Sequence, residues 1–352
     1  MINVQKYIEI EKRRIGPEYP PYVVAELSAN HNGKLDRALE TLVMAKEMGA
    51  DAVKLQTYSP DTMTIDCDNE DFQIKGGLWD GYNLYKLYEW AQTPFEWHQA
   101  LFTKAREIGI TVFSTPFDET AVDLLEELEA PAYKVASFEV VDLPLISKIA
   151  KTGKPVIMST GMANLAEISE AVECARDNGC KDLLLLHCIS SYPAPIEEAN
   201  LRTIPDMRDR FSTLVGLSDH TLGVTASVAS VALGACFIEK HVTLSRADKG
   251  PDSEFSLEPS ELRDLCSSAK AAWLALGKAG YDLKPAEEAN IKFRRSIYAI
   301  RDIDAGERIT SDKIRIIRPG YGLAPKHFQD VVGRKAKAKI KRGTALQWHY
   351  VD

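Results

Sequence analysis

The sequence predicts a (β/α)8 barrel followed by a small, mostly β domain, and three observations predict this fold class. Between residues 22 and 277, short apolar runs alternate with amphipathic helical stretches, and eight such repeats can be counted. No Gly-x-Gly-x-x-Gly motif opens a helical stretch, which disfavours an open doubly wound sheet. From Phe293 onward the helical period gives way to short β-rich runs separated by turns.

Length and composition limit the classes of protein to consider. The 352 residues fit one barrel-sized domain plus an appendage. A net charge of -8 and a pI near 5.5 disfavour nucleic-acid and anionic-membrane partners, which would repel the average field. No run of apolar residues is long enough for a membrane span or resembles a signal peptide. We therefore expect a soluble, cytoplasmic protein that binds neither nucleic acid nor membranes.

The predicted barrel strands and helices alternate along the chain. We place the strands at residues 22–28, 52–57, 111–114, 132–136, 155–159, 183–188, 213–217 and 235–242. We place the main helices at residues 35–47, 94–108, 119–128, 143–151, 163–178 and 258–277. Residues 2–13 alternate like a strand and precede the first barrel strand, so we expect a strand or hairpin that plugs the N-terminal end of the barrel.

The expected domain boundaries follow the change in composition. The barrel domain takes residues 1–280, a linker takes residues 281–292, and the C-terminal domain takes residues 293–352. The C-terminal domain is basic whereas the barrel is acidic. With about sixty residues, it is small enough to depend on docking for part of its stability.

The connection at residues 58–93 is too long for a plain βα loop. It is rich in aromatic residues and has glycines at 76 and 77. Such an insertion can form a wall or lid at the catalytic end of a barrel, or it can pack on the outside or against a second subunit. The sequence leaves both possibilities open.

Two histidines, His220 and His241, each follow a short apolar run. If those runs are neighbouring parallel strands, both imidazoles project from the same end of the sheet. Ser218, Asp219, Glu239 and Lys240 then surround them, with Asp252 on the next loop. These groups suit a divalent metal beside an anionic substrate. The alternative is two strand-end histidines bonded to backbone carbonyls, and the pairing favours the metal.

Two lysines lie within predicted strands, Lys54 and Lys134. Hydroxyl residues stand at other strand ends, among them Thr115, Ser137 and Ser159. A lone strand lysine is more often a snorkelling or ion-paired residue. Two of them together with hydroxyls and a helix N-terminus predict a site for phosphate or carboxylate. No serine stands in a Gly-x-Ser-x-Gly elbow, so no nucleophile triad is expected.

A series of motifs in order along the chain resembles the sialic acid synthase family. They are Glu-Leu-Ser-Ala-Asn-His-Asn-Gly, Val-Lys-Leu-Gln-Thr, Phe-Ser-Thr-Pro-Phe-Asp, Tyr-Lys-Val-Ala-Ser, Met-Ser-Thr-Gly-Met, His-Cys-Ile-Ser-Ser-Tyr-Pro, Gly-Leu-Ser-Asp-His-Thr, Glu-Lys-His, Arg-Arg-Ser and Arg-Pro-Gly. The resemblance implies a barrel followed by an antifreeze-like (SAF) domain, paired as a domain-swapped homodimer. It also implies condensation of phosphoenolpyruvate with an N-acylated amino sugar to give a nine-carbon 2-keto acid and phosphate.

The resemblance also implies a role for each matching residue. His220 and His241 would hold a divalent metal, Mn2+ first, with Mg2+ or Co2+ as alternatives. The residues that would contact phosphoenolpyruvate are Lys54, Thr115, Lys134, Ser137, Ser159 and Ser218. The residues that would face the sugar are Glu26, Tyr192, Glu239 and Asp252. Glu26 and Glu239 are the candidates for proton transfer, and Arg318 would reach the sugar from the partner subunit.

Two features bear on the choice of sugar. The first strand ends in Leu-Ser-Ala-Asn-His, and Ser190 stands where neuraminate-forming enzymes tend to carry Asn. Together with the aromatic segment near residue 80, these features resemble the sequences of pseudaminic acid synthases more than those of neuraminate-forming enzymes. The sugar of the pseudaminic acid synthases is a 6-deoxy diacetamido altrose. A neuraminate or legionaminate synthase is the alternative. A third possibility is a barrel without catalytic activity that binds a sugar phosphate.

Overall fold

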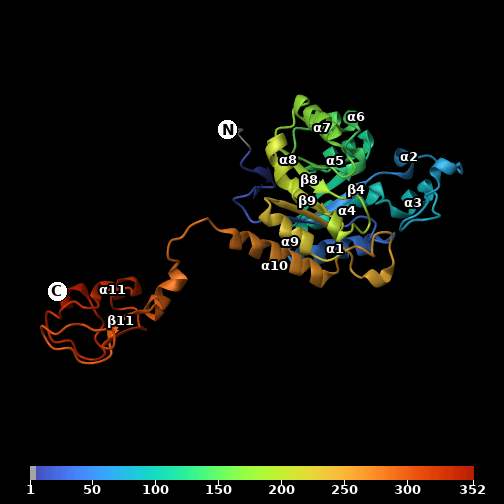
Figure 1. Ribbon diagram of the computed structural model, residues 1–352. Helices are drawn as coiled ribbons and strands as arrows, with labels where there is room; N and C mark the ends of the chain where they lie inside the picture. Colours follow the sequence, from blue (N-terminus) through green and yellow to red (C-terminus); the bar gives the residue numbers. More distant parts are fainter. Residues whose placement is uncertain (1–4) are drawn as a thin grey trace. The chain divides into compact units, whose positions relative to one another are not determined.

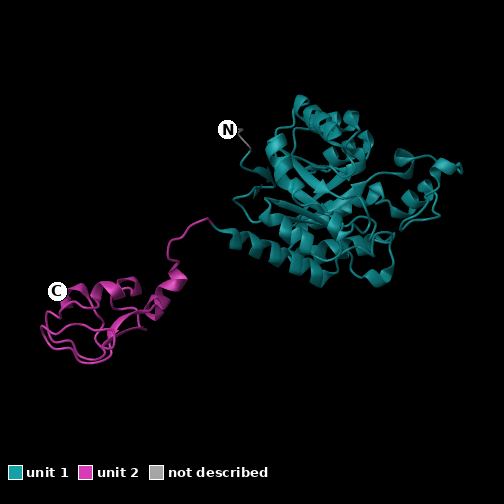
Figure 2. Cartoon of the chain, in the orientation of Figure 1, with its two compact units in different colours: residues 1–277 teal, residues 278–352 magenta. Residues whose placement is uncertain are grey.

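The computed structural model describes residues 5–352, which form two compact units (Figure 2). The first unit ends at Gly277, and the second runs from Lys278 to Asp352. Residues 281–292, expected to be a linker, belong to the second unit. There the segment Pro285–Phe293 forms a run of 3₁₀ helix, η5.

The first unit is a closed barrel of eight parallel strands, which confirms the predicted fold class. Their order around the barrel is β10-β3-β4-β5-β6-β7-β8-β9. The strands are β3 (Tyr22–Glu26), β4 (Ala52–Thr57), β5 (Thr111–Pro116), β6 (Tyr133–Val135), β7 (Val156–Ser159), β8 (Leu183–Cys188), β9 (Leu214–Asp219) and β10 (Phe237–His241). Each overlaps its predicted range, with ends that differ by up to two residues.

Alternation along the strands divides the buried side chains into two sets. Tyr22, Val24 and Phe237 belong to the cluster that fills the N-terminal part of the barrel interior. Their neighbours Val23 and Ile238 belong to the larger cluster between the barrel and its helices. Because side chains of a strand alternate between its two faces, the polar residues at the ends of the first set also point into the barrel.

Helices surround the barrel (Figure 1). They are α1 (Leu35–Met48), α4 (Phe95–Ile108), α5 (Glu119–Glu127), α6 (Leu143–Lys151), α7 (Leu165–Asp177), α8 (Thr203–Phe211), α9 (Thr225–Ala232) and α10 (Pro259–Leu276). Side-chain caps begin several of them: Asp118 accepts from two backbone amides at α5, and Asn164 does so at α7. Within residues 5–352, no helix has both the length and the apolar character needed to span a membrane.

A short hairpin plugs the N-terminal end of the barrel, as the sequence predicts. Strands β1 (Ile8–Ile10) and β2 (Arg13–Ile15) pair in antiparallel register. Ile8, Ile10 and Ile15 are fully buried and belong to the same cluster as the lower barrel interior. The part of the predicted segment before residue 5 lies outside the described residues.

The long insertion after β4 contains two helices, α2 (Pro60–Met63) and α3 (Leu84–Ala91), and a 3₁₀ turn, η1 (Glu70–Phe72). Figure 1 shows this segment standing beside the barrel. Between η1 and α3, Gln73 and Asn83 form an antiparallel bridge. Residues 73–83 therefore make a small hairpin, which we call the Trp79 hairpin.

The second unit is a small β domain with its own core. Strands β11 (Ser296–Ala299) and β12 (Ile314–Ile317) pair in antiparallel register, and isolated bridges connect further segments. Short helical turns complete it: η6 (Pro325–His327), α11 (Phe328–Val331) and η7 (Trp348–Tyr350). Its core is almost entirely aliphatic, with Ile297, Ile303, Ile309 and Ile340 fully buried.

Candidate active site

The C-terminal ends of the barrel strands carry a layer of buried polar side chains above the apolar interior. Its members come from seven of the eight strands: Glu26, Lys54, Thr115, Lys134, Ser159, Ser218, Glu239 and His241. All of them were predicted from the sequence to be site residues. Active sites of (β/α)8 barrels form at this end, so the structure places the predicted residues where chemistry is expected.

Lys54 lies at the centre of this layer. Its Nζ is 2.9 Å from Glu26 Oε2 and 3.4 Å from Glu239 Oε1. It also donates a hydrogen bond of 3.1 Å to Thr115 Oγ1. One ammonium group from β4 thus connects two carboxyl groups and a hydroxyl from three other strands, β3, β10 and β5.

Lys134 supplies a second buried ammonium group. It donates to Ser159 Oγ at 2.7 Å and to the Val135 carbonyl at 3.0 Å, and it lies 3.9 Å from Glu239 Oε1. Ser218 Oγ donates to the same Glu239 oxygen at 3.2 Å. Both lysines therefore face one carboxylate, and each is also bonded to a hydroxyl that was predicted to contact an anion.

The two carboxyl groups have pKa values shifted in opposite directions. Burial raises the pKa of Glu26 to about 7, against the opposing charge of Lys54. Burial acts on Glu239 in the same sense, but the charges of Lys134 and Lys54 outweigh it and lower the pKa of Glu239. Near neutral pH, Glu26 can hold a proton while Glu239 remains a carboxylate, and such separation is typical of acid and base pairs.

The environments of the two lysines also differ. Burial lowers the pKa of Lys134, and the charge of Glu239 offsets this only in part. For Lys54, the charges of Glu239 and Glu26 outweigh burial and raise its pKa. Lys54 is therefore the firmly charged member of the pair.

Loops after β6, β7 and β8 converge beside Lys134. Ser137 begins the 3₁₀ turn η2 (Ser137–Glu139), and its Oγ accepts a hydrogen bond of 3.1 Å from the Gly161 amide. A Cβ atom at Gly161 would lie 2.2 Å from Ser190 Oγ and 2.8 Å from Ser137 Oγ. The glycine is thus required for the two serines to approach each other, and Ser137 and Ser190 extend the hydroxyl set around the lysines.

The two predicted metal ligands lie side by side. The imidazole centroids of His220 and His241 are 5.3 Å apart. His220 Nδ1 is 2.9 Å from the Ile189 carbonyl, which fixes the ring and leaves Nε2 available. Nδ1 of His241 is buried and has no hydrogen-bond partner among the described residues.

These groups fit a divalent cation whose coordination is partly open. An unpartnered buried imidazole nitrogen is costly unless something binds it. The free Oε2 of Glu239 is likewise buried without a partner in the part of the chain that is described. Within residues 5–352 no three His, Cys, Asp or Glu residues are grouped so that together they could hold a metal ion. Catalytic sites commonly leave positions for substrate and water.

An aromatic group borders the histidines. Tyr192 follows β8, and its ring centroid is 4.4 Å from that of His220. Phe255 is 4.9 Å from His241 and 5.2 Å from Tyr192. Asp252 is buried beside them, where its Oδ2 accepts a hydrogen bond from Ser28, and burial raises its pKa. The predicted Tyr192 and Asp252 therefore lie at the site, and Phe255 is an additional member.

Asp219 and Lys240, which the sequence placed around the same rim, are paired on the other face of the sheet. Lys240 Nζ is 2.8 Å from Asp219 Oδ2, and both side chains are about 1% exposed. Asp219 also accepts hydrogen bonds from Thr221 and Ser227. Because side chains alternate along a strand, Lys240 points away from its neighbours Glu239 and His241. The pair supports the loop that carries His220.

Arg318 belongs to the second unit and follows β12. It is exposed and forms no side-chain hydrogen bond or ion pair with any residue from 5 to 352. Its predicted role in the site concerns a second copy of the chain and stays a prediction.

Sequence reasoning missed three residues at or near the site. Ser28 follows β3 within the Leu-Ser-Ala-Asn-His segment, but that segment indicated no role for it, and Phe255 lies in a loop without a periodic pattern. Glu139 is the last residue of the 3₁₀ turn η2, which begins at Ser137. Its Oε2 is buried without a partner in the described residues, and burial raises its pKa to about 7.

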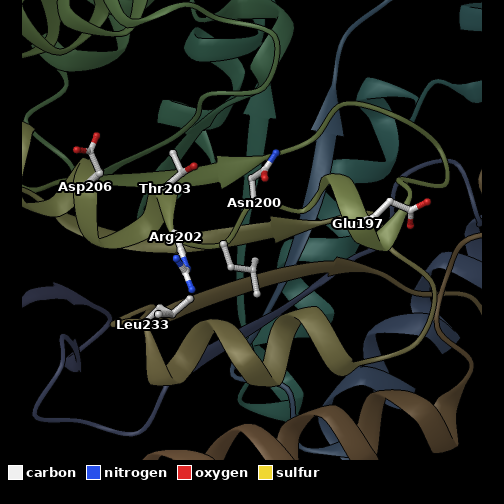
Figure 3. Close-up of a pocket in the computed structure, with 7 residues that line it drawn as sticks. Glu197, Asn200, Arg202, Thr203, Asp206 and Leu233 are labelled. Carbon is white, nitrogen blue, oxygen red and sulfur yellow. The ribbon is translucent and has the colours of Figure 1, made fainter.

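A separate hollow of about 730 Å3 lies on the outside of the barrel (Figure 3). Its lining is Glu197, Asn200, Leu201, Arg202, Thr203, Asp206 and Leu233. Asp206 is exposed and already bonded to Arg210 on its own helix. None of the lining residues, all of which are described, has an unpartnered buried polar atom. The chemistry is therefore assigned to the barrel mouth.

Comparison with known proteins identifies the family of the chain. The sequence matches the NeuB family over residues 41–281 and the SAF domain over residues 294–351. It is 44% identical to the pseudaminic acid synthases of Campylobacter jejuni (93% of this chain, 95% of that protein) and Helicobacter pylori (93% and 96%). It is 38% identical to an N,N'-diacetyllegionaminic acid synthase of C. jejuni, covering 92% and 98%.

A solved structure shares the same fold. The N-acetylneuraminic acid synthetase of Leptospira borgpetersenii, crystallised with citrate, is 30% identical and superposes with a TM-score of 0.72. The match covers 82% of this chain and 96% of that chain. The chain is a member of the NeuB family, with a (β/α)8 barrel followed by a SAF domain.

Proposed function

We propose that the protein is a pseudaminic acid synthase. It condenses phosphoenolpyruvate with 2,4-diacetamido-2,4,6-trideoxy-L-altrose and water to give pseudaminic acid and phosphate. The observation that carries this proposal is one barrel mouth in which two buried lysines approach Glu239 and two imidazoles lie side by side, with Nδ1 of His241 buried and unpartnered among the described residues. The names of the relatives that are 44% identical support the choice of sugar.

Phosphoenolpyruvate binds on the side of the two lysines. It carries a phosphate and a carboxylate, and the site offers it two ammonium groups. The hydroxyl donors around them are Thr115, Ser137, Ser159, Ser190 and Ser218. In the structure four of these hydroxyls are bonded to a lysine, to Glu239 or to backbone, and Ser190 lies 3.8 Å from Cys188 Sγ, so the arrangement is held in place before the anion arrives. Preorganised charges of this kind bind anions without rearranging when the ligand binds.

His220 and His241 hold a divalent metal, with Mn2+ first and Mg2+ or Co2+ as alternatives. When bound, such a cation polarises a carbonyl oxygen as a Lewis acid. The chain's own residues orient the ligands, since the Ile189 carbonyl fixes His220. Phe255 and Tyr192 cover the imidazoles and limit the access of water.

The reaction joins C3 of phosphoenolpyruvate to the aldehyde carbon of the open-chain sugar. Water adds at C2, and phosphate leaves with its bridging oxygen as the C2–O bond breaks. The protonated fraction of Glu26 can donate a proton to the former aldehyde oxygen, which becomes the new hydroxyl group, while the carboxylate of Glu239 can accept one from the attacking water. Lys54 contacts both carboxyl groups and keeps them oriented.

The sugar lies on the side of Tyr192 and Asp252. We also propose that the protein works as a domain-swapped homodimer in which Arg318 of the partner subunit completes the sugar site. The support is an exposed guanidinium with no partner among the described residues, on a basic domain of an otherwise acidic chain. A planar guanidinium can hold an amide carbonyl or two hydroxyls at once.

Two alternatives differ from this proposal in different ways. A legionaminate or neuraminate synthase would use the same chemistry on another sugar, and the relative that is 38% identical keeps that option relevant. A non-catalytic sugar-phosphate-binding barrel would bind the ligands without turnover. The intact set of lysines, carboxylates and histidines argues against it, because a binding protein has no need of paired proton-transfer groups.

Phosphate release from phosphoenolpyruvate tests these possibilities together. The sugars to compare are 2,4-diacetamido-2,4,6-trideoxy-L-altrose, its legionaminate-forming counterpart and N-acetylmannosamine, each with and without EDTA. We expect release with the altrose derivative to exceed the others and to stop after chelation. Preference for another sugar would change the assignment within the family. Binding without release by any sugar would favour the non-catalytic barrel.

A further inference from the structure

The Trp79 hairpin, residues 73–83, has a backbone that its sequence fixes. Ile74 N donates to Tyr82 O at 2.9 Å, and Gly81 N donates to Ile74 O at 3.0 Å. Gly76, Gly77 and Gly81 have φ angles of 80°, 76° and 83°. These left-handed conformations are open to glycine without strain and unfavourable for other residues. The tip of the hairpin is thus shaped by glycines on both sides of Trp79.

Trp79 is turned inward from this tip. From residue 75 to residue 80 it is the one side chain that is not exposed. Its indole Nε1 donates a hydrogen bond of 3.1 Å to the Pro251 carbonyl, next to the buried Asp252. Its ring centroid is 5.6 Å from that of Tyr192.

These contacts carry Trp79 across the barrel mouth. The hairpin follows β4, whereas Tyr192 follows β8, and the strand order β10-β3-β4-β5-β6-β7-β8-β9 places β4 and β8 on opposite sides of the barrel. Pro251 and Asp252 follow β10. A side chain that contacts the loops after β8 and β10 from a hairpin after β4 must span the space above the polar layer.

Trp79, Tyr192 and Phe255 therefore form a continuous aromatic wall beside the metal-binding histidines. Tyr192 is the middle ring, at 4.4 Å from His220 and 5.6 Å from Trp79. An extended six-carbon chain spans roughly 6 Å at C–C bonds of about 1.5 Å. His220 and Trp79 each lie next to Tyr192, so a sugar that lies along this wall with its aldehyde near His220 directs its terminal carbon toward the indole.

The indole offers that terminal carbon an apolar face. Its single polar hydrogen is already bonded to Pro251, so it has no donor left for a ligand. A methyl group gains from contact with the ring, whereas a hydroxymethyl group loses water without gaining a partner. From this geometry we propose that Trp79 selects amino sugars that end in a methyl group over those that end in a hydroxymethyl group. This inference rests on the proposed function and adds the residue that sets its sugar class.

Two sugars that differ by one oxygen atom test the proposal. They are 2,4-diacetamido-2,4,6-trideoxy-L-altrose and the same sugar with a hydroxyl at C6. The full-length protein is compared with Trp79→Ala and with the matched control Trp90→Ala. Trp90 belongs to the same insertion and is 40% exposed; it stacks on Tyr82 and forms no aromatic pair with Trp79, Tyr192 or Phe255 among the described residues. Two readouts are used: kcat/KM for phosphate release, and sugar affinity from quenching of tryptophan fluorescence.

We expect the wild type to prefer the 6-deoxy sugar by about tenfold or more, the size of effect that an unpaired buried hydroxyl produces. Trp79→Ala should reduce this preference to within about threefold, chiefly by lowering kcat/KM for the 6-deoxy sugar. It should also abolish the quenching of tryptophan fluorescence by the sugar. Trp90→Ala should change neither the preference nor the quenching. Equal losses for both sugars, or an undiminished preference, would overturn the proposal by showing that Trp79 only closes the site or does not contact the sugar. Because quenching needs no turnover, a preference seen in binding without phosphate release would support the role of Trp79 and refute the synthase function.

Discussion

At the scale of single residues, the site depends on charges that are buried in contact with one another. Lys54 and Lys134 both approach Glu239 Oε1, at 3.4 and 3.9 Å, so the two cations share one carboxylate. Two lysines against one shared carboxylate leave positive charge that an anionic ligand could neutralise. Hydrogen bonds to charged groups contribute about 1.5–3 kcal/mol each, which corresponds to roughly ten- to a hundredfold in affinity.

Replacing either lysine by methionine should therefore weaken phosphoenolpyruvate binding by about ten- to a hundredfold. Methionine keeps most of the side-chain volume, so the barrel should stay folded. The KM for the sugar should change much less, which steady-state kinetics with each substrate varied in turn would show. A change confined to the sugar KM in Lys54→Met would place the anion site elsewhere.

The activity should also depend on the protonation of Glu26. Burial raises its pKa to about 7, so the protonated form is abundant below that pH and is lost above it. If Glu26 donates a proton, kcat/KM falls as the pH rises through about 7. Glu26→Asp should move this alkaline limb, and a profile that stays unchanged in Glu26→Asp would exclude Glu26 as the titrating group. Glu139, whose pKa burial also raises to about 7, provides the control as Glu139→Gln, which should leave the limb in place.

These residue identities could largely be predicted from the sequence. Strand-end lysines, hydroxyls and histidines are visible as polar positions that end apolar runs, and most of those assigned to the barrel lie at its mouth. The sequence did not show which charged side chains pair with each other. Lys240 stands between Glu239 and His241, but only the register of β10 shows that its side chain points away from the site and pairs with Asp219.

At the scale of the element, the Asp219–Lys240 pair joins β9 to β10 behind the site. Burial alone would raise the pKa of Asp219, but the charge of Lys240 and the hydrogen bonds of Lys240 and Ser227 lower it. A carboxyl group with a lowered pKa stabilises the folded state above its unfolded-state pKa, near 3.8. This stabilisation is lost as the pH falls through the folded-state value.

Replacing Asp219 by asparagine should therefore lower the stability of the barrel by roughly 3–5 kcal/mol at neutral pH, because it leaves Lys240 buried without a counter-charge. The measurement is the midpoint of thermal or denaturant unfolding. Asp206→Asn is the matched control, since Asp206 pairs with Arg210 on an exposed helix face and such pairs contribute about 0–1 kcal/mol. Equal small effects of the two substitutions would show that the buried pair does not support the strand ends.

The position of the Trp79 hairpin could not be predicted from the sequence. The length and aromatic content of residues 58–93 indicated a functional insertion but left open whether it covers the mouth or the outside of the barrel. Trp79 lies beside Tyr192 because of a long-range contact between opposite sides of the barrel. No local pattern encodes such a contact, although glycines around a lone tryptophan mark a tip of defined shape.

At the scale of the whole molecule, the barrel topology agrees with the sequence prediction, whereas residues 281–292, expected to be a linker, belong to the second unit. Eight βα repeats closed into one barrel, and the basic C-terminal segment formed a small aliphatic core of its own. Strand number follows from alternating apolar periodicity, which is a local property. The assembly of subunits depends on contacts between surfaces of different chains, and the apolar pattern along one chain does not indicate which surfaces these are.

Arg318 links the proposed assembly to activity. If the partner's Arg318 completes each site, inactive Arg318→Ala chains mixed with inactive His220→Ala chains should recover activity. Random exchange gives mixed dimers with one intact site, so up to about a quarter of wild-type turnover should return. Proven subunit exchange without recovered activity would contradict the swapped arrangement and leave Arg318 as a surface residue of its own domain.

The most direct test of the central claim is the fate of the bridging oxygen of phosphoenolpyruvate. Phosphoenolpyruvate labelled with oxygen-18 at that position is incubated with the protein, Mn2+ and 2,4-diacetamido-2,4,6-trideoxy-L-altrose. Mass spectrometry then measures the oxygen-18 content of both products. Condensation with C–O cleavage predicts one labelled phosphate for each nine-carbon 2-keto acid, which itself carries no label. Label retained in a pyruvyl product, or phosphate formed without the keto acid, would contradict a synthase reaction at this barrel mouth.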